Sequence, residues 1–269
     1  RRPEPILSRL LDRSPDWLLQ SHSDIPILPV RLQGTYAVWP RWARAPRRSK
    51  VSAHIGKPVF AGSRESAAEL EARLSRLITP QAAPVSRLGP IAARGIESVI
   101  YRCPACLCFD TIRSGRRGHF RCSACSADFT LMSDFSVRRP GDPVRSPLSG
   151  LYRRIRPASA GMLSNWEPSL TGARANLSVE KRGRLEAVGS GRLTVSDRSL
   201  TFESVSASVH VDLESIRSLV IEGARKLRVY GSRPARLYQF SLADQSALKW
   251  QEVLVEILRS RFGRSPSTT

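Results

Sequence analysis

All five cysteines of this 269-residue chain lie in the stretch YRCPACLCFDTIRSGRRGHFRCSACSADF, residues 101–129, and four of them form two Cys-x-x-Cys pairs. Cys103 and Cys106 are separated by 15 residues from Cys122 and Cys125, a spacing typical of metal sites with four thiolate ligands. Each pair places two thiolates on one tight turn, and two such turns complete a tetrahedron around one ion. The spacing therefore predicts one bound Zn²⁺ with Zn–S distances of about 2.3 Å. Four cysteine ligands leave no position for a water molecule, so the predicted ion is structural.

Short β-rich runs precede both pairs, at residues 98–101 and 119–121, and the segment 95–133 resembles a zinc ribbon. The alternative is a pair of disulfides, which requires an oxidising compartment. Cys108 is expected to be a free thiol, and His119 is not expected to be a ligand, because four cysteines already complete the site. Three arginines between the pairs either contact phosphates or form a solvated turn: Arg113, Arg116 and Arg117.

The charge of the chain indicates a polyanionic partner. Lys and Arg number 43 against 23 Asp and Glu, which gives a net charge of +20 and an isoelectric point near 11.1. Nucleic acid, an anionic membrane surface and a phosphate-bearing substrate all fit this excess. No stretch has 18 consecutive apolar residues, so no spanning helix is expected. The first residues lack both an initiating Met and a signal-peptide pattern, and we interpret them as the interior of a longer polypeptide.

Residues 1–80 have the pattern of the end of an α/β domain. Two short helical patterns occupy residues 5–20, and the apolar run 25–32 is typical of a strand buried on both faces. A second strand is predicted at 51–59. A helix is predicted over 66–78, because Ser66-x-x-Glu69 forms a capping box and Leu70, Leu74, Leu77 and Ile78 share one face.

SDIPILPVRLQGTYAVWPR, followed by KVSAHIGKPV, resembles the closing segment of lysophosphatidic acid acyltransferase domains. The matching block is the apolar strand Ile25–Val30 with prolines at its second and fifth positions, followed by Gly34-Thr35-Tyr36 and Trp39-Pro40. The resemblance implies an acyl thioester donor and a lysophospholipid acceptor. It also implies substrate contacts at Pro29, Arg31 and Gly34.

The same resemblance shows what the chain lacks. The family uses a His-x-x-x-x-Asp pair as general base, and a Gly-Thr-Arg block for the acceptor phosphate. Neither occurs here: the residues five places after the four histidines are Ile27, Val59, Ala124 and Ser215. No catalytic residue is assigned, and we expect this chain alone to be inactive as an acyltransferase. We also expect the sheet around residues 26–31 to lack strands, leaving Ile27 and Val30 undercovered on at least one side.

The segment from Arg31 to Phe60 carries seven Lys or Arg and no acidic residue. It is expected to face anionic lipid, with Trp39 and Trp42 at the headgroup level. The corresponding expectation for the whole protein is a cytoplasmic location, peripheral to the inner face of the membrane. The other interpretation of the segment is a solvated basic loop.

Residues 134–180 are rich in Pro, Gly, Ser and Arg and are predicted to be a linker. From there on, alternating apolar residues predict several strands, with a hairpin turn at 196–199, and an amphipathic helix is predicted over 242–259 behind Ser241. Residues 181–262 thus resemble a pleckstrin-homology-like (PH-like) domain. In such domains phospholipid headgroups or peptides bind, and the basic residues available here are Lys226, Arg228, Arg233 and Arg236.

The predicted architecture is multidomain α+β: a truncated α/β acyltransferase half-domain, a zinc ribbon with four cysteine ligands, and a PH-like antiparallel β-barrel with a C-terminal helix. The predicted function is the C-terminal part of a membrane-associated glycerolipid acyltransferase, with the catalytic His/Asp block upstream. The alternative is a basic zinc-ribbon and PH-like module that binds nucleic acid, protein or anionic lipid without catalysis. Nucleic acid is the less favoured partner, because no aromatic stacking platform is evident.

Overall fold

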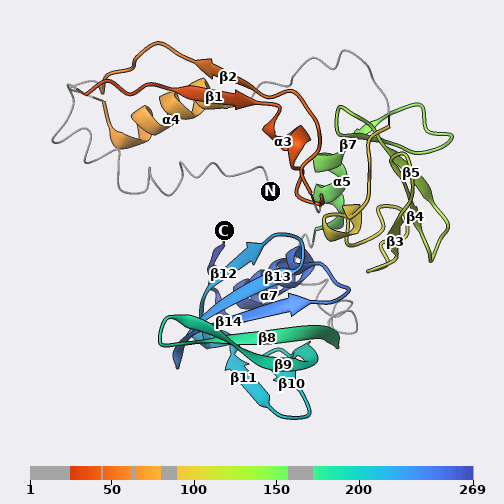
Figure 1. The fold of residues 1–269 in the computed structure, drawn as a ribbon, viewed down its shortest axis with the longest axis vertical. Coiled ribbons are helices and arrows are strands. Elements are labelled where there is room, and N and C mark those ends of the chain that lie inside the picture. The colour runs from red at the N-terminus through yellow and green to blue at the C-terminus, as the bar shows by residue number, and fades with distance from the viewer. Residues whose placement is uncertain (1–24, 44, 62–64, 80–89, 157–171, 269) are drawn as a thin grey trace. The chain divides into compact units, whose positions relative to one another are not determined.

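The computed structural model describes residues 25–43, 45–61, 65–79, 90–156 and 172–268. The chain divides into two compact units (Figure 1). Unit 1 comprises residues 1–40 and 45–84, and unit 2 comprises residues 41–44 and 85–269. The helical patterns predicted within residues 5–20 lie outside the described residues.

Unit 1 is a two-stranded antiparallel sheet with one helix against it. Strand β1 (Val30–Gln33) pairs with β2 (Ser52–Ile55), and the short helix α3 (Thr35–Val38) follows β1. Helix α4 (Ala67–Ile78) begins with the predicted capping box, in which Ser66 Oγ accepts from the Glu69 N–H and the Glu69 side chain accepts from the Ser66 N–H. Its buried residues Leu70 and Leu74 pack with Ala61, Ile27 and Val59.

The predicted strand over residues 25–32 is shorter than expected. Its ladder starts only at Val30, and the preceding residues contribute a single bridge, between Ile27 and Val59. Pro26 and Pro29 explain the difference, because proline has no N–H to donate to a ladder. The expectation of burial on both faces is also wrong for the described sheet, since Leu28 is 51% exposed and Val30 is 45% exposed.

Unit 2 begins with a small β module built around the cysteines. Its five-stranded antiparallel sheet has the order β3-β4-β5-β6-β7, and the 3₁₀ helix η1 (Ile96–Ser98) precedes it. The strands are β3 (Ile112–Ser114), β4 (His119–Cys122), β5 (Asp128–Leu131), β6 (Ser136–Arg138) and β7 (Ser146–Pro147). Phe120 and Phe129 stack with ring centroids 5.1 Å apart at the centre of this sheet. The predicted strand at 119–121 is present, whereas the one predicted at 98–101 is replaced by η1 and irregular chain.

Secondary structure occupies much of the segment 134–180 that the sequence predicts to be a linker. Strands β6 and β7 extend the ribbon sheet, and helix α5 (Leu148–Ile155) follows them with Leu148, Leu151 and Ile155 buried. Strand β8 then begins at Ala173, before the expected boundary at 181. Three apolar residues at helical spacing suffice for α5, and the surrounding Arg, Pro and Ser conceal them in a composition argument.

The C-terminal part of unit 2 is a curled antiparallel sheet closed by a helix, which is the PH-like arrangement predicted from the sequence. The strands are β8 (Ala173–Lys181), β9 (Arg184–Val195), β10 (Ser199–Glu203), β11 (Ser208–Asp212), β12 (Ile216–Glu222), β13 (Lys226–Ser232) and β14 (Ala235–Leu242). Their order is β11-β10-β9-β8-β14-β13-β12, so the first strand pairs with the last. The short strand β15 (Ser267–Thr268) adds to β12 in parallel. The order ends at β11 and β15, which gives the sheet two edges rather than the expected closed barrel.

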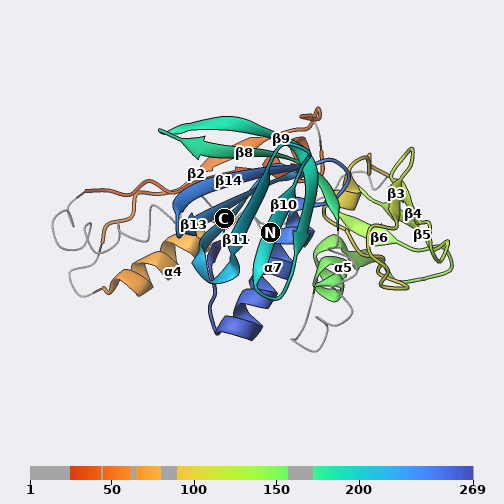
Figure 2. The same ribbon diagram turned by 90° about the horizontal axis from the view of Figure 1, so that it is seen from below.

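Helix α7 (Ala247–Phe262) packs against β12 and β13 of the curled sheet (Figure 2). The predicted apolar stripe is confirmed, with Trp250 and Leu254 fully buried. The helix begins later than predicted, because β14 continues to Leu242 and the cap is Ser246, whose Oγ accepts from the Lys249 N–H at 3.3 Å. The predicted cap Ser241 lies inside β14, paired with Asn176.

Among the described residues, no helix is long and apolar enough to cross a membrane.

Candidate metal centre

Two turns of nearly identical backbone geometry present the four cysteines. In the first turn, the Cys103 N–H donates to the Cys108 carbonyl and the Leu107 N–H returns to the Cys103 carbonyl. In the second, the Cys122 N–H donates to the Ala127 carbonyl and the Ser126 N–H returns to the Cys122 carbonyl. Leu107 and Ser126 both adopt positive φ, at 62° and 58°. The chain therefore reverses in the same way twice and aims both pairs of thiols inward.

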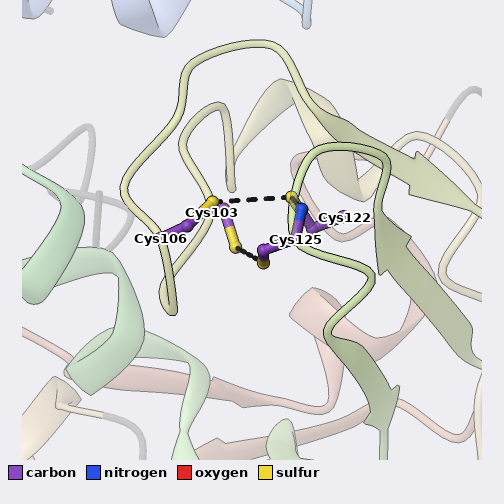
Figure 3. A group of neighbouring side chains, drawn as sticks. All are labelled: Cys103, Cys106, Cys122 and Cys125. Carbon is purple, nitrogen blue, oxygen red and sulfur yellow. Dashed lines mark hydrogen bonds between the residues drawn. The ribbon is translucent and has the colours of Figure 1, made fainter.

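The four sulfur atoms converge on one point (Figure 3). Cys103 Sγ lies 3.7 Å from Cys125 Sγ, Cys106 Sγ lies 3.7 Å from Cys122 Sγ, and all four sulfurs are within 4.8 Å of one another. A disulfide needs sulfurs at about 2.0 Å, so the alternative of two disulfides is not what the structure shows. A tetrahedron with metal–sulfur distances of about 2.3 Å has edges of about 3.8 Å, which the distances of 3.7 Å in these two pairs match. The four cysteines therefore fit a metal ion.

The pKa values of two thiols in this cluster, Cys103 and Cys122, are shifted in opposite directions. Burial raises the pKa of Cys103. Burial also opposes ionisation of Cys122, but hydrogen bonds with the Thr111 hydroxyl and with the N–H groups of Cys125 and Ala124 outweigh it and lower the pKa of that thiol. A divalent ion binds thiolates and displaces the remaining protons, so metal binding would remove this inequality.

The other candidate residues in this region stay outside the cluster. Cys108 is exposed, with its Sγ directed at the Cys106 carbonyl at 3.8 Å, and it is a free thiol as expected. His119 has an exposed side chain that pairs with the Thr130 hydroxyl and lies outside the cysteine cluster. The hairpin arginines are exposed: Arg113, Arg116 and Arg117.

The three substrate-binding candidates of unit 1 lie close together in the sequence but differ in environment. Pro29 is buried, and Arg31 is half-buried on β1 with a buried Nε that has no hydrogen-bond partner among the described residues. Gly34 has φ of 86°, and a Cβ there would lie 2.2 Å from the Lys50 carbonyl oxygen. Only glycine fits this close approach, so Gly34 shapes the loop, whereas Arg31 offers an unsatisfied donor.

Trp39 and Trp42, both expected at a lipid surface, differ in burial. Trp39 is 60% exposed in unit 1. Trp42 is fully buried in unit 2, where it packs edge-on against Phe135 and its Nε1–H donates to the Ala92 carbonyl at 3.4 Å. The expectation is therefore wrong for Trp42, which is a core residue.

A set of buried polar contacts, which no pattern in the sequence indicates, joins the ribbon to α7. Lys249 is fully buried, with its Nζ 2.5 Å from Asp110 Oδ2. Glu252 accepts hydrogen bonds from the Tyr101 and Tyr152 hydroxyls and pairs with Arg156 at 3.0 Å. Polar positions on a C-terminal helix normally indicate a solvated face, and nothing local reveals that the ribbon covers this one.

These contacts shift the pKa values of several buried side chains. Burial and the charge of Glu252 raise the pKa values of Tyr101 and Tyr152, so both phenols stay protonated as donors. Burial lowers the pKa of Lys249, against the opposing charge of Asp110. The cavity at this junction measures about 50 Å³, which is far smaller than an ordinary ligand site. The junction therefore holds the two modules together and offers no substrate pocket.

The fold combines a small β module, whose four clustered cysteines could hold a metal ion, with a curled sheet that resembles a PH-like fold. Comparisons with known proteins add structural neighbours. No protein-family model matches the chain, and no curated protein matches it. The N-terminal PH domain of human ARAP2 is 15% identical, covering 38% of this chain and 90% of its own, with a TM-score of 0.28. Inner Membrane Complex Sub-compartment Protein 3 of Toxoplasma gondii is 12% identical over 39% of this chain and 89% of its own, with a TM-score of 0.29. Vav1 is 12% identical over 34% of this chain and 18% of its own, with a TM-score of 0.26.

Proposed function

We propose that this chain is the closing part of a membrane-associated glycerolipid acyltransferase, extended by a structural zinc ribbon and a PH-like domain. The full enzyme would transfer an acyl group from a thioester donor to a lysophospholipid. None of the residues described here is assigned a catalytic role. The proposal rests on unit 1, whose sequence resembles the last block of that family.

The single observation that carries the proposal is the bare apolar face of unit 1. Ile27, just before β1, packs against the buried residues of α4, and Pro29 is buried. Apolar residues that alternate with them along the strand are exposed, together with one residue of β2: Leu28 at 51%, Val30 at 45%, Leu32 at 49% and Ile55 at 68%. Strands apolar on both faces are typical of α/β sheets covered on both sides. Among the described residues, this exposed face of the sheet therefore has the apolar composition of a buried surface.

Arg31 supports the assignment of an anionic acceptor to this unit. Its Nε is buried without a hydrogen-bond partner among the described residues, and such groups are uncommon because desolvation without a partner costs about 1–3 kcal/mol. A phosphate oxygen of the acceptor would satisfy it. Pro29 and Gly34 would shape the strand and loop on either side of this contact.

Zinc is the ion that the ribbon suits best. An all-thiolate tetrahedral set favours Zn²⁺ or iron–sulfur chemistry over hard cations, and the Cys-x-x-Cys spacing is that of structural zinc sites. When bound, the ion would cross-link Cys103, Cys106, Cys122 and Cys125 and would leave no open coordination position. Its role would be to hold the ribbon together.

The basic stretch of unit 1 supports a peripheral position on an anionic membrane, on the cytoplasmic side. Arg47, Arg48, Lys50 and Lys57 lie in or beside the segment between β1 and β2, and the last three are exposed. Near an anionic surface each basic residue contributes about 1 kcal/mol. The exposed Trp39 would add an interfacial anchor.

The test is an acyl-transfer assay on two proteins: residues 1–269, and the polypeptide read from the same gene upstream of Arg1. We expect no transfer from an acyl thioester to lysophosphatidic acid by the first protein, and transfer by the second. In the longer protein, Arg31→Gln should raise KM for the acceptor more than it lowers kcat, with Arg76→Gln on α4 as the matched exposed control. Absence of transfer by the longer protein would refute the proposal.

A second candidate is a binding module without catalysis. The exposed hairpin arginines of the ribbon favour it, because three positive charges lie close together in the sequence on β3 and the β3–β4 turn. Under this alternative, tight binding to single-stranded nucleic acid should be lost when Arg116 and Arg117 are replaced by Gln. Salt dependence would then follow the number of phosphates contacted.

A further inference from the structure

An arginine-rich cavity opens at one edge of the PH-like sheet, away from the ribbon contacts. It has a volume of about 710 Å³ and is formed by the β9–β10 turn, η3 (Leu213–Ser215), the β13–β14 turn and the end of α7. We call it the arginine basin. Four arginines and two carboxylates line it: Arg198, Arg217, Arg233, Arg264, Asp212 and Glu214.

The walls of the arginine basin are tied to one another. Ser232 Oγ donates to the Ser215 carbonyl at 2.9 Å, which fixes the end of β13 to η3. Arg264 Nη1 donates to the Glu214 carbonyl at 2.6 Å, and β15 pairs with β12 just beyond it. The basin is therefore a built feature of the domain rather than a chance gap between loops.

Three arginines of the basin carry a positive charge that no described carboxylate neutralises in an ion pair. No ion pair joins Arg198, Arg217 or Arg233 to any carboxylate in the described parts of the chain, although Asp212 and Glu214 line the same cavity. By contrast, two basic residues singled out in the sequence are paired on the sheet: Arg228 lies 2.8 Å from Glu222, and Lys226 lies 3.9 Å from it. Of the four residues expected to meet a headgroup, Arg233 alone lines the basin.

We propose that the arginine basin binds a phosphomonoester, presented either by a small soluble molecule or by a lipid headgroup. Guanidinium groups form bidentate, charge-assisted hydrogen bonds with phosphate oxygens. A cavity of this volume falls in the range of small-ligand sites, about 300–1,000 Å³. The proposal concerns unit 2 alone and does not depend on the acyltransferase assignment.

The shape and charge of the basin favour a compact dianion over a nucleic-acid strand. A strand needs a continuous basic track, whereas Asp212 and Glu214 interrupt this one with negative charge. A compact group carrying two charges can meet several guanidinium groups at once and keep clear of both carboxylates. Nucleic acid is therefore an outcome of the test and not the proposal.

The experiment is calorimetric titration of residues 1–269, loaded with zinc, with glycerol 3-phosphate. In parallel, flotation is measured with phosphatidylcholine vesicles that contain or lack phosphatidic acid. The variant is Arg217→Gln with Arg233→Gln. The matched control is Arg192→Gln with Arg236→Gln, two exposed arginines on β9 and β14 that do not line the basin.

Binding of either ligand by the natural protein and the control, weakened on the order of tenfold or more in the basin variant, supports the proposal. Glycerol 3-phosphate binding identifies a soluble ligand, and binding only to phosphatidic acid vesicles identifies a headgroup. Failure of both ligands to bind overturns the proposal. Equal weakening in the basin variant and the control also overturns it, because the effect is then one of net charge. Stronger, basin-dependent binding of a single-stranded oligonucleotide would replace the proposal with nucleic-acid binding. All variants alter exposed side chains, and circular dichroism checks that they fold.

Discussion

Lys249 and Asp110 form an ion pair whose two partners differ in burial, and this difference predicts unequal effects of mutation. The Lys249 side chain is fully buried, whereas that of Asp110 is 34% exposed. Asp110→Asn leaves a buried ammonium without its counter-charge and should cost roughly 3–5 kcal/mol. Lys249→Met leaves a carboxylate that water reaches, and we expect it to cost far less. Urea unfolding of both variants measures the difference, and equal losses would contradict the argument.

The same pair predicts a pH dependence. The folded pKa of Lys249 is lowered mainly by burial, and Asp110 opposes that shift, so Asp110→Asn should lower it further. A base with a lowered folded pKa binds more protons when unfolded, so stability rises as pH increases from the folded pKa towards the unfolded one. The deficit of Asp110→Asn should therefore shrink between neutral and alkaline pH. A deficit that stays constant over this range would show that Lys249 remains charged in the variant.

At the scale of single residues, the sequence predicts which cysteines cluster and misses the polar contacts of α7. The spacing of two Cys-x-x-Cys pairs implies their geometry, so the four clustered cysteines can be named without a structure. Lys249 and Asp110 lie 139 positions apart, and no local sequence pattern around either residue predicts that they pair. The prediction for Trp42 is wrong for a similar reason. A tryptophan among arginines is typical of an interface, and the local sequence does not show that Trp42 packs against Phe135.

At the scale of elements, the ribbon and α7 support one another. The ribbon covers the polar side of α7, with Ser246 Oγ donating to the Ser98 carbonyl at 2.6 Å and Glu252 bound to two tyrosines. Loss of the ribbon would expose these groups and break up a satisfied buried network. We therefore expect the folding of α7 to depend on the ribbon.

Cys122→Ser should unfold the ribbon, because metal-binding free energy is folding free energy there, on the order of 10 kcal/mol. We expect the variant, or the natural protein treated with a chelator, to lose hydrogen-exchange protection in α7 as well. Cys108→Ser is the matched control and should change neither zinc content nor protection, since that thiol is exposed. Full protection of α7 in Cys122→Ser would show that the helix is independent of the ribbon.

Local sequence patterns predict the boundaries of helices and strands in this chain poorly. The start of α7 depends on how far β14 runs, and that is set by its pairing with β8 across the sheet. Helix α5 is missed because it has few apolar residues. Their role in packing is evident only once the ribbon sheet is known to lie beside them. The strands of the PH-like domain are easier to predict, because each alternates over several residues with period two.

At the scale of the whole molecule, unit 1 should tolerate polar residues on one side only. Leu32→Lys places a charge on the bare face and should cost less than about 0.5 kcal/mol. Leu70→Ala empties the cluster beneath the sheet and should cost about 2–5 kcal/mol. Hydrogen exchange of α4 amides measures both changes. A large loss for Leu32→Lys would mean that this face is covered in solution.

The net positive charge of the chain predicts electrostatic binding to anionic membrane surfaces. Binding to vesicles should increase with their content of anionic lipid and fall as salt is added, since the Debye length shortens to about 3 Å at 1 M. The basin control Arg192→Gln with Arg236→Gln should weaken this binding only slightly. Equal binding to neutral vesicles would count against the electrostatic explanation.

The helix at Ala67–Ile78, the cysteine cluster and the alternating strands of the curled sheet could be predicted from the sequence, since capping, spacing and alternation are each local patterns. The grouping of ribbon and PH-like domain into one unit could not, because it depends on packing between distant segments.

The pairing of β8 with β14 has a consequence for the order in which the protein is made. The first strand of the curled sheet has no partner on one side until β14 has been synthesised, and α7 emerges after that. The ribbon is synthesised earlier and can take up its ion while the sheet is still incomplete. The nascent helix then meets a finished surface carrying Asp110, Tyr101 and Tyr152. Metal supply during translation would thus govern how quickly the last helix docks, and cells starved of zinc should accumulate chains that proteases cut after β14.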